Sequence, residues 1–410
     1  MIPPVTTIDM PLRTEGTGTA STVRPGAPQQ PQWGNDPRLA GVKAQLAAAP
    51  ALVTPRQLRQ LRAALATVAV GRGRVLQAGD CAESFYECRS DITDAKVNAL
   101  NRMADRLSTH TATPVVRIGR IGGQYAKPRS SPYEVRDGVE LPSFRGHLVN
   151  SELPDLAARA HDPRRMLWAY HASARVLERL GEHRARLRRP AATYGLWSSH
   201  EALVLDYETA LLRQDTAVGE NYLASTHLPW IGKRTGDIDG SHVELLAGVT
   251  NPVGYKVGPD TTPSDLVGLC GVLDPDRTPG RLVLIARLGR AAVADVLPGQ
   301  VAAVRDAGHP VVWLCDPMHG NTITTSDGYK TRRLSDLIAE ARQFRSVLER
   351  EAVPVGGLHL ESSGFAADIT ECVGGSVTDE RQVGHRYTTL CDPRLTTDQA
   401  MELIDACFGV

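Results

Sequence analysis

The chain has 410 residues, of which 42% are hydrophobic and 22% charged, so it can bury a large core. Its formal net charge is zero, which argues against a nucleic-acid-binding protein, because neutralising phosphates requires a basic face. The sequence shows neither an apolar run of membrane length nor a cationic segment followed by an apolar one, and we therefore predict a cytoplasmic protein without a membrane partner.

The first 70 residues divide into two segments. Residues 1–32 are rich in Pro, Thr and Gly and lack periodicity, which is typical of a mobile arm. Residues 33–70 show a helical pattern in which Leu58, Leu61 and Leu65 share one face, and Thr54 followed by Pro55 is typical of a helix start. We predict a helical extension that covers the floor of the following domain or serves an oligomer interface.

Residues 71–410 alternate between short apolar runs and helix-length segments. In VVWLCDPMHGN, residues 311–321, an apolar run turns abruptly polar, as expected of a buried parallel strand whose carboxyl end opens into a polar site. Eight such units predict a (β/α)8 TIM barrel as the catalytic domain, with its site at the carboxyl ends of the strands. The alternative is an open doubly wound sheet, which would concentrate function at one or two strand ends. The runs are residues 74–78, 114–118, 191–196, 222–225, 252–255, 282–286, 311–314 and 355–360.

Basic side chains gather in the polar segments that follow these runs. At one barrel mouth such like charges would repel one another unless bound anions compensated them. Six cations suit two phosphorylated ligands, or one phosphate and a carboxylate, whereas the alternative is that they pair with surface acids. The chain has only six lysines, and four of them fall in these polar segments. The six cations are Arg120, Lys127, Arg129, Arg234, Lys256 and Arg287.

Four further side chains are candidate metal ligands. Cys81, His319, Glu361 and Asp392 each follow an apolar or strand-like segment, and only a barrel could bring them together. One thiolate, one imidazole and two carboxylates suit a divalent transition ion rather than Mg²⁺ or Ca²⁺. The alternative is that each is a satisfied polar group of the core.

From about residue 31 to the C-terminus, the chain resembles the type II 3-deoxy-D-arabino-heptulosonate 7-phosphate (DAHP) synthases. It is most similar to the short bacterial forms associated with aromatic antibiotic pathways. The segments that carry the resemblance are GDCAE, RIGRIGGQYAKPRS, SHEALVLDYE, WIGKRT, NPVGYKVGP, WLCDPMHGNT, GLHLESS with ITECVGG, and CDPRL.

The resemblance implies a (β/α)8 enzyme of the shikimate pathway, with a further link to secondary metabolism. Such an enzyme condenses phosphoenolpyruvate with erythrose 4-phosphate in a metal-dependent, aldol-type reaction that yields DAHP and phosphate. Mn²⁺ or Co²⁺ is the expected cofactor, with Zn²⁺ or Fe²⁺ as alternatives, and the expected assembly is a homo-oligomer, a dimer or a tetramer.

The resemblance also implies residue roles. The metal would be held by Cys81, His319, Glu361 and Asp392, the four candidates named above. Phosphoenolpyruvate would be bound by Arg120, Arg234, Lys256 and Arg287, with Lys127 beside the reacting carbons. The phosphate of erythrose 4-phosphate would lie near Arg129 and Ser130. The implied catalytic residues are Lys127, His319 and Glu201, and Asp316 is a supporting residue.

Two positions depart from the family's usual pattern. Lys233 stands where the family usually has Glu before the Arg of WIGxRT, and His147 stands where an acid usually follows Arg-Gly. These changes leave open an amino-DAHP synthase of the aminoshikimate pathway, with an amino-sugar phosphate as acceptor, although losing acids is a poor way to bind an amine. A non-catalytic regulatory paralogue is a further alternative, but it would be expected to have lost metal ligands.

Seven cysteines without a CxxC pair indicate reduced thiols. Cys391 adjoins Asp392, so we expect it near Cys81, where a disulfide would silence the metal site. The alternative is a buried bystander thiol.

Overall fold

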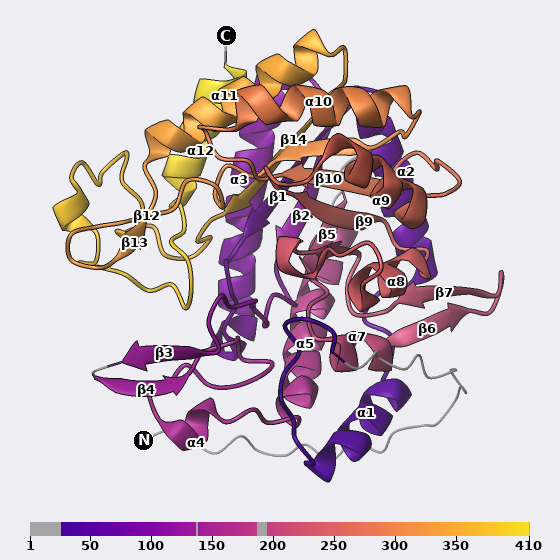
Figure 1. Ribbon diagram of the computed structural model, residues 1–410, viewed down its shortest axis with the longest axis vertical. Coiled ribbons are helices and arrows are strands. Elements are labelled where there is room, and N and C mark those ends of the chain that lie inside the picture. The colour runs from indigo at the N-terminus through magenta and orange to yellow at the C-terminus, as the bar shows by residue number, and fades with distance from the viewer. Residues whose placement is uncertain (1–25, 137, 187–194, 410) are drawn as a thin grey trace.

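The computed structural model describes residues 26–136, 138–186 and 195–409. Eight parallel strands close into a barrel in the order β1-β14-β11-β10-β9-β8-β5-β2, which confirms the predicted TIM barrel (Figure 1). The strands of the barrel are β1 (Arg74–Gly79), β2 (Val115–Arg120), β5 (Leu196–Glu201), β8 (Leu228–Ile231), β9 (Val253–Val257), β10 (Leu282–Ala286), β11 (Val312–Cys315) and β14 (Val355–Glu361).

Helices cover the outside of the barrel (Figure 1). Apolar side chains fill the layer between these helices and the strands. None of the helices in the described part of the chain combines the length and the apolar character needed to cross a membrane. The helices after β1 are η1 (Phe85–Cys88), α3 (Ser90–Thr111), α4 (Leu156–Arg159), α5 (Arg165–Arg186), α7 (Leu205–Ala210), η2 (Lys233–Thr235), α8 (Ser241–Ala247), α9 (Pro263–Leu273), α10 (Val293–Asp306), α11 (Leu334–Arg350), η3 (Glu380–Gln382) and α12 (Thr397–Phe408).

The predicted helical extension contains α1 (Arg38–Ala48) and α2 (Pro55–Ala69). α2 begins at a capping box, in which the Thr54 hydroxyl accepts from Gln57 N–H and the Gln57 side chain accepts from Thr54 N–H. Leu61 and Leu65 pack against side chains of the barrel interior, including Val75 and Val312. α2 therefore closes the floor of the barrel, at the end opposite the carboxyl ends of the strands.

The third and fourth barrel strands lie later in the chain than predicted. β5 contains the polar residues that were expected to follow the third run, and residues 191–194 of that run lie outside the described residues. Ser199 of β5 accepts from Gln77 of β1, which is not a neighbouring strand, so this bond crosses the barrel interior. β8 replaces the predicted run 222–225, and it was missed because it is short and contains Pro229, a residue that usually marks a loop or an edge.

Within residues 26–136, 138–186 and 195–409, three antiparallel hairpins leave the barrel. They are β3 (Tyr133–Arg136) with β4 (Val139–Pro142), β6 (Leu212–Asp215) with β7 (Glu220–Leu223), and β12 (Ile323–Thr324) with β13 (Lys330–Thr331). The first and the third project on the left of Figure 1. Ser130, just before β3, and Lys330, in β13, both line the same cavity, so these two hairpins flank it.

Residues 1–25 of the predicted arm lie outside the described residues. Within the remainder, Gln29 and Gln30 are hydrogen-bonded to the barrel domain through Arg129 and Leu203. The predicted arm is therefore anchored before its expected end at residue 32.

Candidate active site

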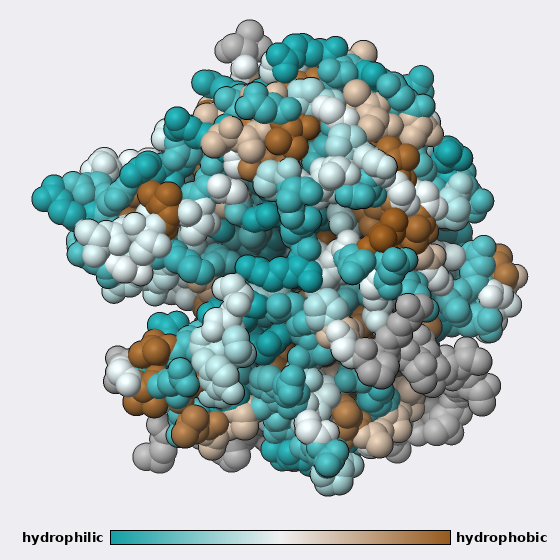
Figure 2. All heavy atoms as spheres, viewed as in Figure 1, coloured by the Kyte–Doolittle hydropathy of each residue, from teal (hydrophilic) through white to brown (hydrophobic). Residues whose placement is uncertain are grey.

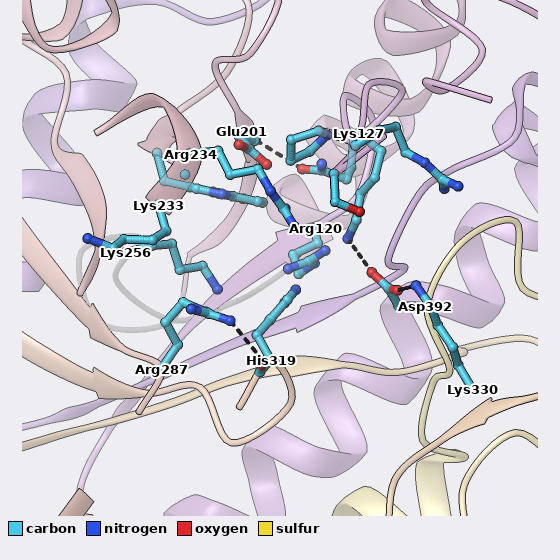
Figure 3. Close-up of a pocket in the computed structure, with 16 residues that line it drawn as sticks. Arg120, Lys127, Glu201, Lys233, Arg234, Lys256, Arg287, His319, Lys330 and Asp392 are labelled. Carbon is cyan, nitrogen blue, oxygen red and sulfur yellow. Dashed lines mark hydrogen bonds and ion pairs between the residues drawn. The ribbon is translucent and has the colours of Figure 1, made fainter. Parts of the chain in front are cut away.

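A polar cavity of about 290 Å³ opens at the carboxyl ends of the barrel strands. The molecular face in Figure 2 is hollowed near its centre between hydrophilic residues, and Figure 3 shows the side chains that line the cavity. The lining residues are Arg120, Gln124, Lys127, Pro128, Arg129, Ser130, Glu201, Trp230, Gly232, Lys233, Arg234, Lys256, Arg287, His319, Lys330 and Asp392.

The cavity is strongly cationic, although the whole chain is neutral. Eight Lys or Arg side chains line it, against the two acids Glu201 and Asp392. All six cations singled out in the sequence are among the eight, together with Lys233 and Lys330. Some of these cations pair with acids behind the lining, such as Arg129 with Glu134 and Lys256 with Asp316, but the lining itself stays predominantly cationic and suits multiply charged anionic ligands.

Three of the four candidate metal ligands meet beside this cavity. Cys81, Glu361 and Asp392 each offer a ligand atom, and these atoms all lie within 4.8 Å of one another. The strand register explains why Cys81 and Glu361 lie close together. Gly79 of β1, two residues before Cys81, pairs with Glu361 of β14 and also with Arg120 of β2. A side chain at position 79 would place its Cβ 2.6 Å from the Arg120 carbonyl oxygen, so glycine permits the strands to approach here.

His319 lies next to this group but is not among the three that converge. Its Nδ1 is 2.7 Å from Asp316 Oδ2, and its Nε2 is 3.2 Å from Glu361 Oε1. A carboxylate that accepts from Nδ1 fixes the ring so that Nε2 faces Glu361. The imidazole can therefore share a cation with Glu361, and the mixed donor set fits a divalent transition ion.

The carboxylate of Glu361 is surrounded by positive charge. Lys127 Nζ lies 3.3 Å from Oε1 and Arg332 Nη2 lies 2.9 Å from Oε2. Burial opposes ionisation, but the charges of His319, Lys127 and Arg332 outweigh it and hold the pKa of Glu361 well below its usual range. Glu361 is therefore an anion that can hold a metal.

Lys127 bridges the candidate metal ligands and the cavity. Its Nζ lies 3.3 Å from Glu361 Oε1 and 3.3 Å from Asp392 Oδ2, and Figure 3 shows the second of these contacts. Burial would lower the pKa of Lys127, but the charges of Cys81, Glu361 and Asp392 raise it well above its usual value. The side chain is therefore a fixed positive charge and a hydrogen-bond donor.

Burial shifts the pKa values of Lys256 and Glu201. Burial lowers the pKa of Lys256 to about 8, although its ion pair with Asp316 opposes the shift. Burial likewise raises the pKa of Glu201, against the charges of Lys127 and Lys256. Glu201 Oε1 is buried without a hydrogen-bond partner in the described residues, so it is available to a bound molecule.

A family profile and several curated relatives match almost the whole chain. The profile of the class-II DAHP synthetase family covers residues 19–186 and 181–407. A protein of Pseudomonas fluorescens, named probable phospho-2-dehydro-3-deoxyheptonate aldolase, is 44% identical over 92% of this chain and 94% of its own length. Relatives with the same enzyme name in Streptomyces coelicolor and Mycolicibacterium smegmatis are 40% and 38% identical, over 93% and 91% of their lengths.

The chain belongs to the class-II DAHP synthetase family. It is therefore an enzyme, a transferase of the 3-deoxy-7-phosphoheptulonate synthase class.

The two positions that depart from the pattern of the DAHP synthases have different surroundings. Lys233 lines the cavity, where its Nζ is 3.0 Å from Asp260 Oδ1 and 3.3 Å from Thr261 Oγ1. His147 does not line it. Its Nδ1 accepts from Phe85 N–H at 3.0 Å and its Nε2 lies 2.6 Å from Glu152 Oε2, so it is a buried structural residue.

A buried ionic network ties the segment of Asp392 to the strand of Cys81. Arg394 Nη1 lies 2.6 Å from Asp80 Oδ1, and Arg394 Nη2 lies 2.8 Å from Glu371 Oε1. Glu371 Oε1 also accepts from the backbone N–H groups of Thr388 and Thr389. Because Asp80 adjoins Cys81 and Arg394 follows Asp392 by two residues, this network positions both candidate ligands.

Sequence reasoning missed Lys330 and Arg332, which contact the candidate ligands. Lys330 Nζ lies 3.0 Å from Asp392 Oδ1 (Figure 3). The scarcity of lysine was a usable signal, because the four lysines that line the cavity are two-thirds of the six in the chain. Arg332 carried no such signal, since it is one of forty arginines.

Cys391 lies beside Cys81, as predicted. The Cys81 thiol donates to Asp392 Oδ2 at 3.7 Å and accepts from Asp392 N–H at 3.2 Å, and its closeness to Cys391 lowers the pKa of Cys391. Burial raises the pKa of Cys81 well above its usual value, so a bound cation would have to stabilise its thiolate.

Proposed function

We propose that this enzyme condenses phosphoenolpyruvate with erythrose 4-phosphate to give DAHP and inorganic phosphate, and that it needs a divalent transition metal. The observation that carries the proposal is one cavity with eight cationic side chains beside Cys81, Glu361 and Asp392. Two phosphorylated substrates, one with an added carboxylate, supply the negative charge that this cavity lacks.

The cations fall into two groups, and we assign one to each substrate. Lys127, Arg129 and Ser130 belong to one loop, and we assign Arg129 and Ser130 to the phosphate of the sugar. We assign phosphoenolpyruvate to the remaining cations of the barrel mouth, namely Arg120, Arg234, Lys256 and Arg287. Arg120 keeps little donor capacity for it, because its guanidinium already donates to the Asp80 carbonyl, His359 and Glu361.

The metal is assigned to Cys81, His319, Glu361 and Asp392, with Mn²⁺ or Co²⁺ as the expected ion and Zn²⁺ or Fe²⁺ as alternatives. Such an ion, when bound, acts as a Lewis acid that polarises the aldehyde oxygen of the sugar phosphate. His319 meets this assignment with its Nε2 lone pair, because Asp316 accepts from its other nitrogen.

The chain's own groups then perform the remaining work. The two sets of cations hold C3 of phosphoenolpyruvate against the aldehyde carbon, where the new carbon–carbon bond forms. Lys127 Nζ donates a hydrogen bond to the aldehyde oxygen as it gains negative charge, and this oxygen becomes a hydroxyl by taking up a proton from solvent. Water adds to C2 and gives one proton to Glu201. The C2 hydroxyl then gives its remaining proton to the departing phosphate as the bond from C2 to the phosphate oxygen breaks, which leaves a ketone at C2.

Other parts of the proposal are broader. We propose residues 71–410 as the catalytic unit, a homo-oligomeric assembly, and a cytoplasmic location in which the seven cysteines are thiols. A role in the shikimate pathway follows from the proposed product, and a link to secondary metabolism remains part of the proposal.

Phosphate release by the purified protein tests this function. We expect release with phosphoenolpyruvate and erythrose 4-phosphate, its loss in EDTA, and its return with Mn²⁺ or Co²⁺. Release only with an amino-sugar phosphate would instead support the amino-DAHP synthase, and no release with either acceptor would support the regulatory paralogue. Activity that survives exhaustive chelation would falsify the metal dependence.

A further inference from the structure

Gln29 uses both ends of its side-chain amide on the backbone of a single cavity residue. Gln29 Nε2 donates to the Arg129 carbonyl oxygen at 3.1 Å, and Arg129 N–H donates to Gln29 Oε1 at 2.9 Å. Arg129 lines the cavity, whereas Gln29 lies outside it, in the segment that leads into α1. The amide therefore satisfies both backbone groups of Arg129, as a neighbouring strand would do in a sheet.

The loop that contains Arg129 depends on such contacts. Residues 121–132 form neither helix nor strand, so their backbone groups must find partners elsewhere. Lys127 N–H donates to the Arg145 carbonyl oxygen at 2.9 Å, and Arg145 Nη2 donates to the Gln29 carbonyl oxygen at 2.6 Å. Gln29 and Arg145 therefore hold this loop from behind, on the side away from the cavity.

The backbone of Gln29 indicates that its side chain is specifically needed. Its φ is +62°, in the left-handed region, which glycine adopts freely and other residues adopt at a cost. A glycine here would relieve this strain but would leave the Arg129 peptide groups without the amide. The strain is retained where the side chain makes two hydrogen bonds to the candidate phosphate-binding loop.

Gln30, the next residue, provides an internal comparison. Its amide makes the same kind of paired contact, with Nε2 donating to the Leu203 carbonyl oxygen at 2.9 Å and Leu205 N–H donating to Oε1 at 2.9 Å. Gln30 therefore anchors the same segment to a different part of the barrel, next to α7.

We infer that Gln29 is a positioning residue for the sugar-phosphate substrate, because it fixes the backbone from which Arg129 and Ser130 reach the cavity. This inference rests on the proposed function, in which these two residues bind the acceptor phosphate. Gln29 touches no substrate and acts only through Arg129.

The test compares Gln29→Gly with the wild type and with Gln30→Ala. Gln29→Gly removes the amide without adding backbone strain, so it separates positioning from folding. We expect its KM for erythrose 4-phosphate to rise roughly tenfold, the loss expected for one or two hydrogen bonds, while its KM for phosphoenolpyruvate and its Tm stay unchanged. Amide hydrogen exchange at Arg129 should become faster in Gln29→Gly but not in Gln30→Ala.

An unchanged KM for the sugar phosphate, or an equal rise in both KM values, would overturn the inference. So would a matching effect of Gln30→Ala, because the segment as a whole would then be responsible. If Gln29→Gly does not fold, Gln29→Asn takes its place, since Asn tolerates a left-handed backbone but its amide is one methylene short. A wild type that releases no phosphate would refute the proposed function alone, and unaltered exchange at Arg129 in the variant would still refute the positioning role.

Discussion

Lys256 shows how burial can set the pH range of substrate binding at a single residue. Its pKa is lowered from 10.5 to about 8, chiefly by burial, so the ammonium form that binds anions is lost as the pH rises through about 8. We therefore predict that the KM for phosphoenolpyruvate rises roughly tenfold or more above that pH, the loss expected for a hydrogen bond to a charged group. Steady-state kinetics between pH 6.5 and pH 9.5 would measure it.

The control for this prediction is Lys256→Arg, because a guanidinium stays charged across the whole range. Whatever its KM at neutral pH, this variant should show no rise near pH 8. A wild-type KM that stays flat to pH 9.5 would contradict the assignment of Lys256 to phosphoenolpyruvate.

The neighbouring residues Cys81 and Cys391 predict that oxidation inactivates the enzyme. The two thiols are neighbours, so an oxidant such as diamide can take up their hydrogens and leave a disulfide. We expect two fewer titratable thiols and loss of phosphate release after mild oxidation, with protection by prior addition of Mn²⁺, which would occupy Cys81.

Cys391→Ser is the matched variant, since it keeps Cys81 but removes its partner. It should retain both its activity and its remaining thiols under the same treatment. If Mn²⁺ gives the wild type no protection, the link between Cys81 and the metal loses its support.

At the scale of elements, the ionic network of Arg394 joins two distant segments of the chain. Asp80 directly follows the last residue of β1, whereas Glu371 and Arg394 belong to the segment between β14 and α12. Both acids are fully buried, and removing Arg394 would leave them without this partner. The network therefore couples the stability of the C-terminal segment to the placement of Asp392.

We predict that Arg394→Met lowers the free energy of unfolding by roughly 3–5 kcal/mol, as expected when one partner of a buried ion pair is removed. Metal affinity should fall as well, because Asp392 would no longer be fixed beside Cys81. Urea denaturation and titration with Mn²⁺ would measure the two effects.

Arg386→Met is the control for this element, because Arg386 and Asp368 form an exposed ion pair in the same segment. It should change stability by less than about 1 kcal/mol and leave metal affinity unaltered. Equal effects of the two substitutions would mean that the buried network does not position Asp392.

Across the whole molecule, the fold could largely be predicted from the sequence because each barrel strand ends in a change from apolar to polar residues. The apolar runs before Arg120, Lys256 and Glu361 correspond to β2, β9 and β14. β5 was misplaced because the barrel interior near the site is polar, so Ser199 and Glu201 look like loop residues, and β8 was missed because it is short and contains Pro229. Prediction of strands from hydropathy assumes that interior residues are apolar. The interior residues near the functional site are polar, so the prediction fails there.

The site could be predicted in part, for a physical reason. The cations of the cavity could be recognised in the sequence, because they follow predicted strands in a chain whose net charge is zero. The role of Gln29 could not be recognised in this way. Its contact with Arg129 joins residues 100 positions apart through an uncharged amide, which leaves no pattern of charge or hydropathy in the sequence. Such contacts depend on the final packing of the chain.

Anomalous diffraction from crystals grown with Mn²⁺ would test the central claim most directly. We predict a single strong peak at the carboxyl ends of the strands, within bonding distance of Cys81, His319, Glu361 and Asp392. A peak bonded to other side chains, or none at this place in an enzyme that still releases phosphate, would contradict the account.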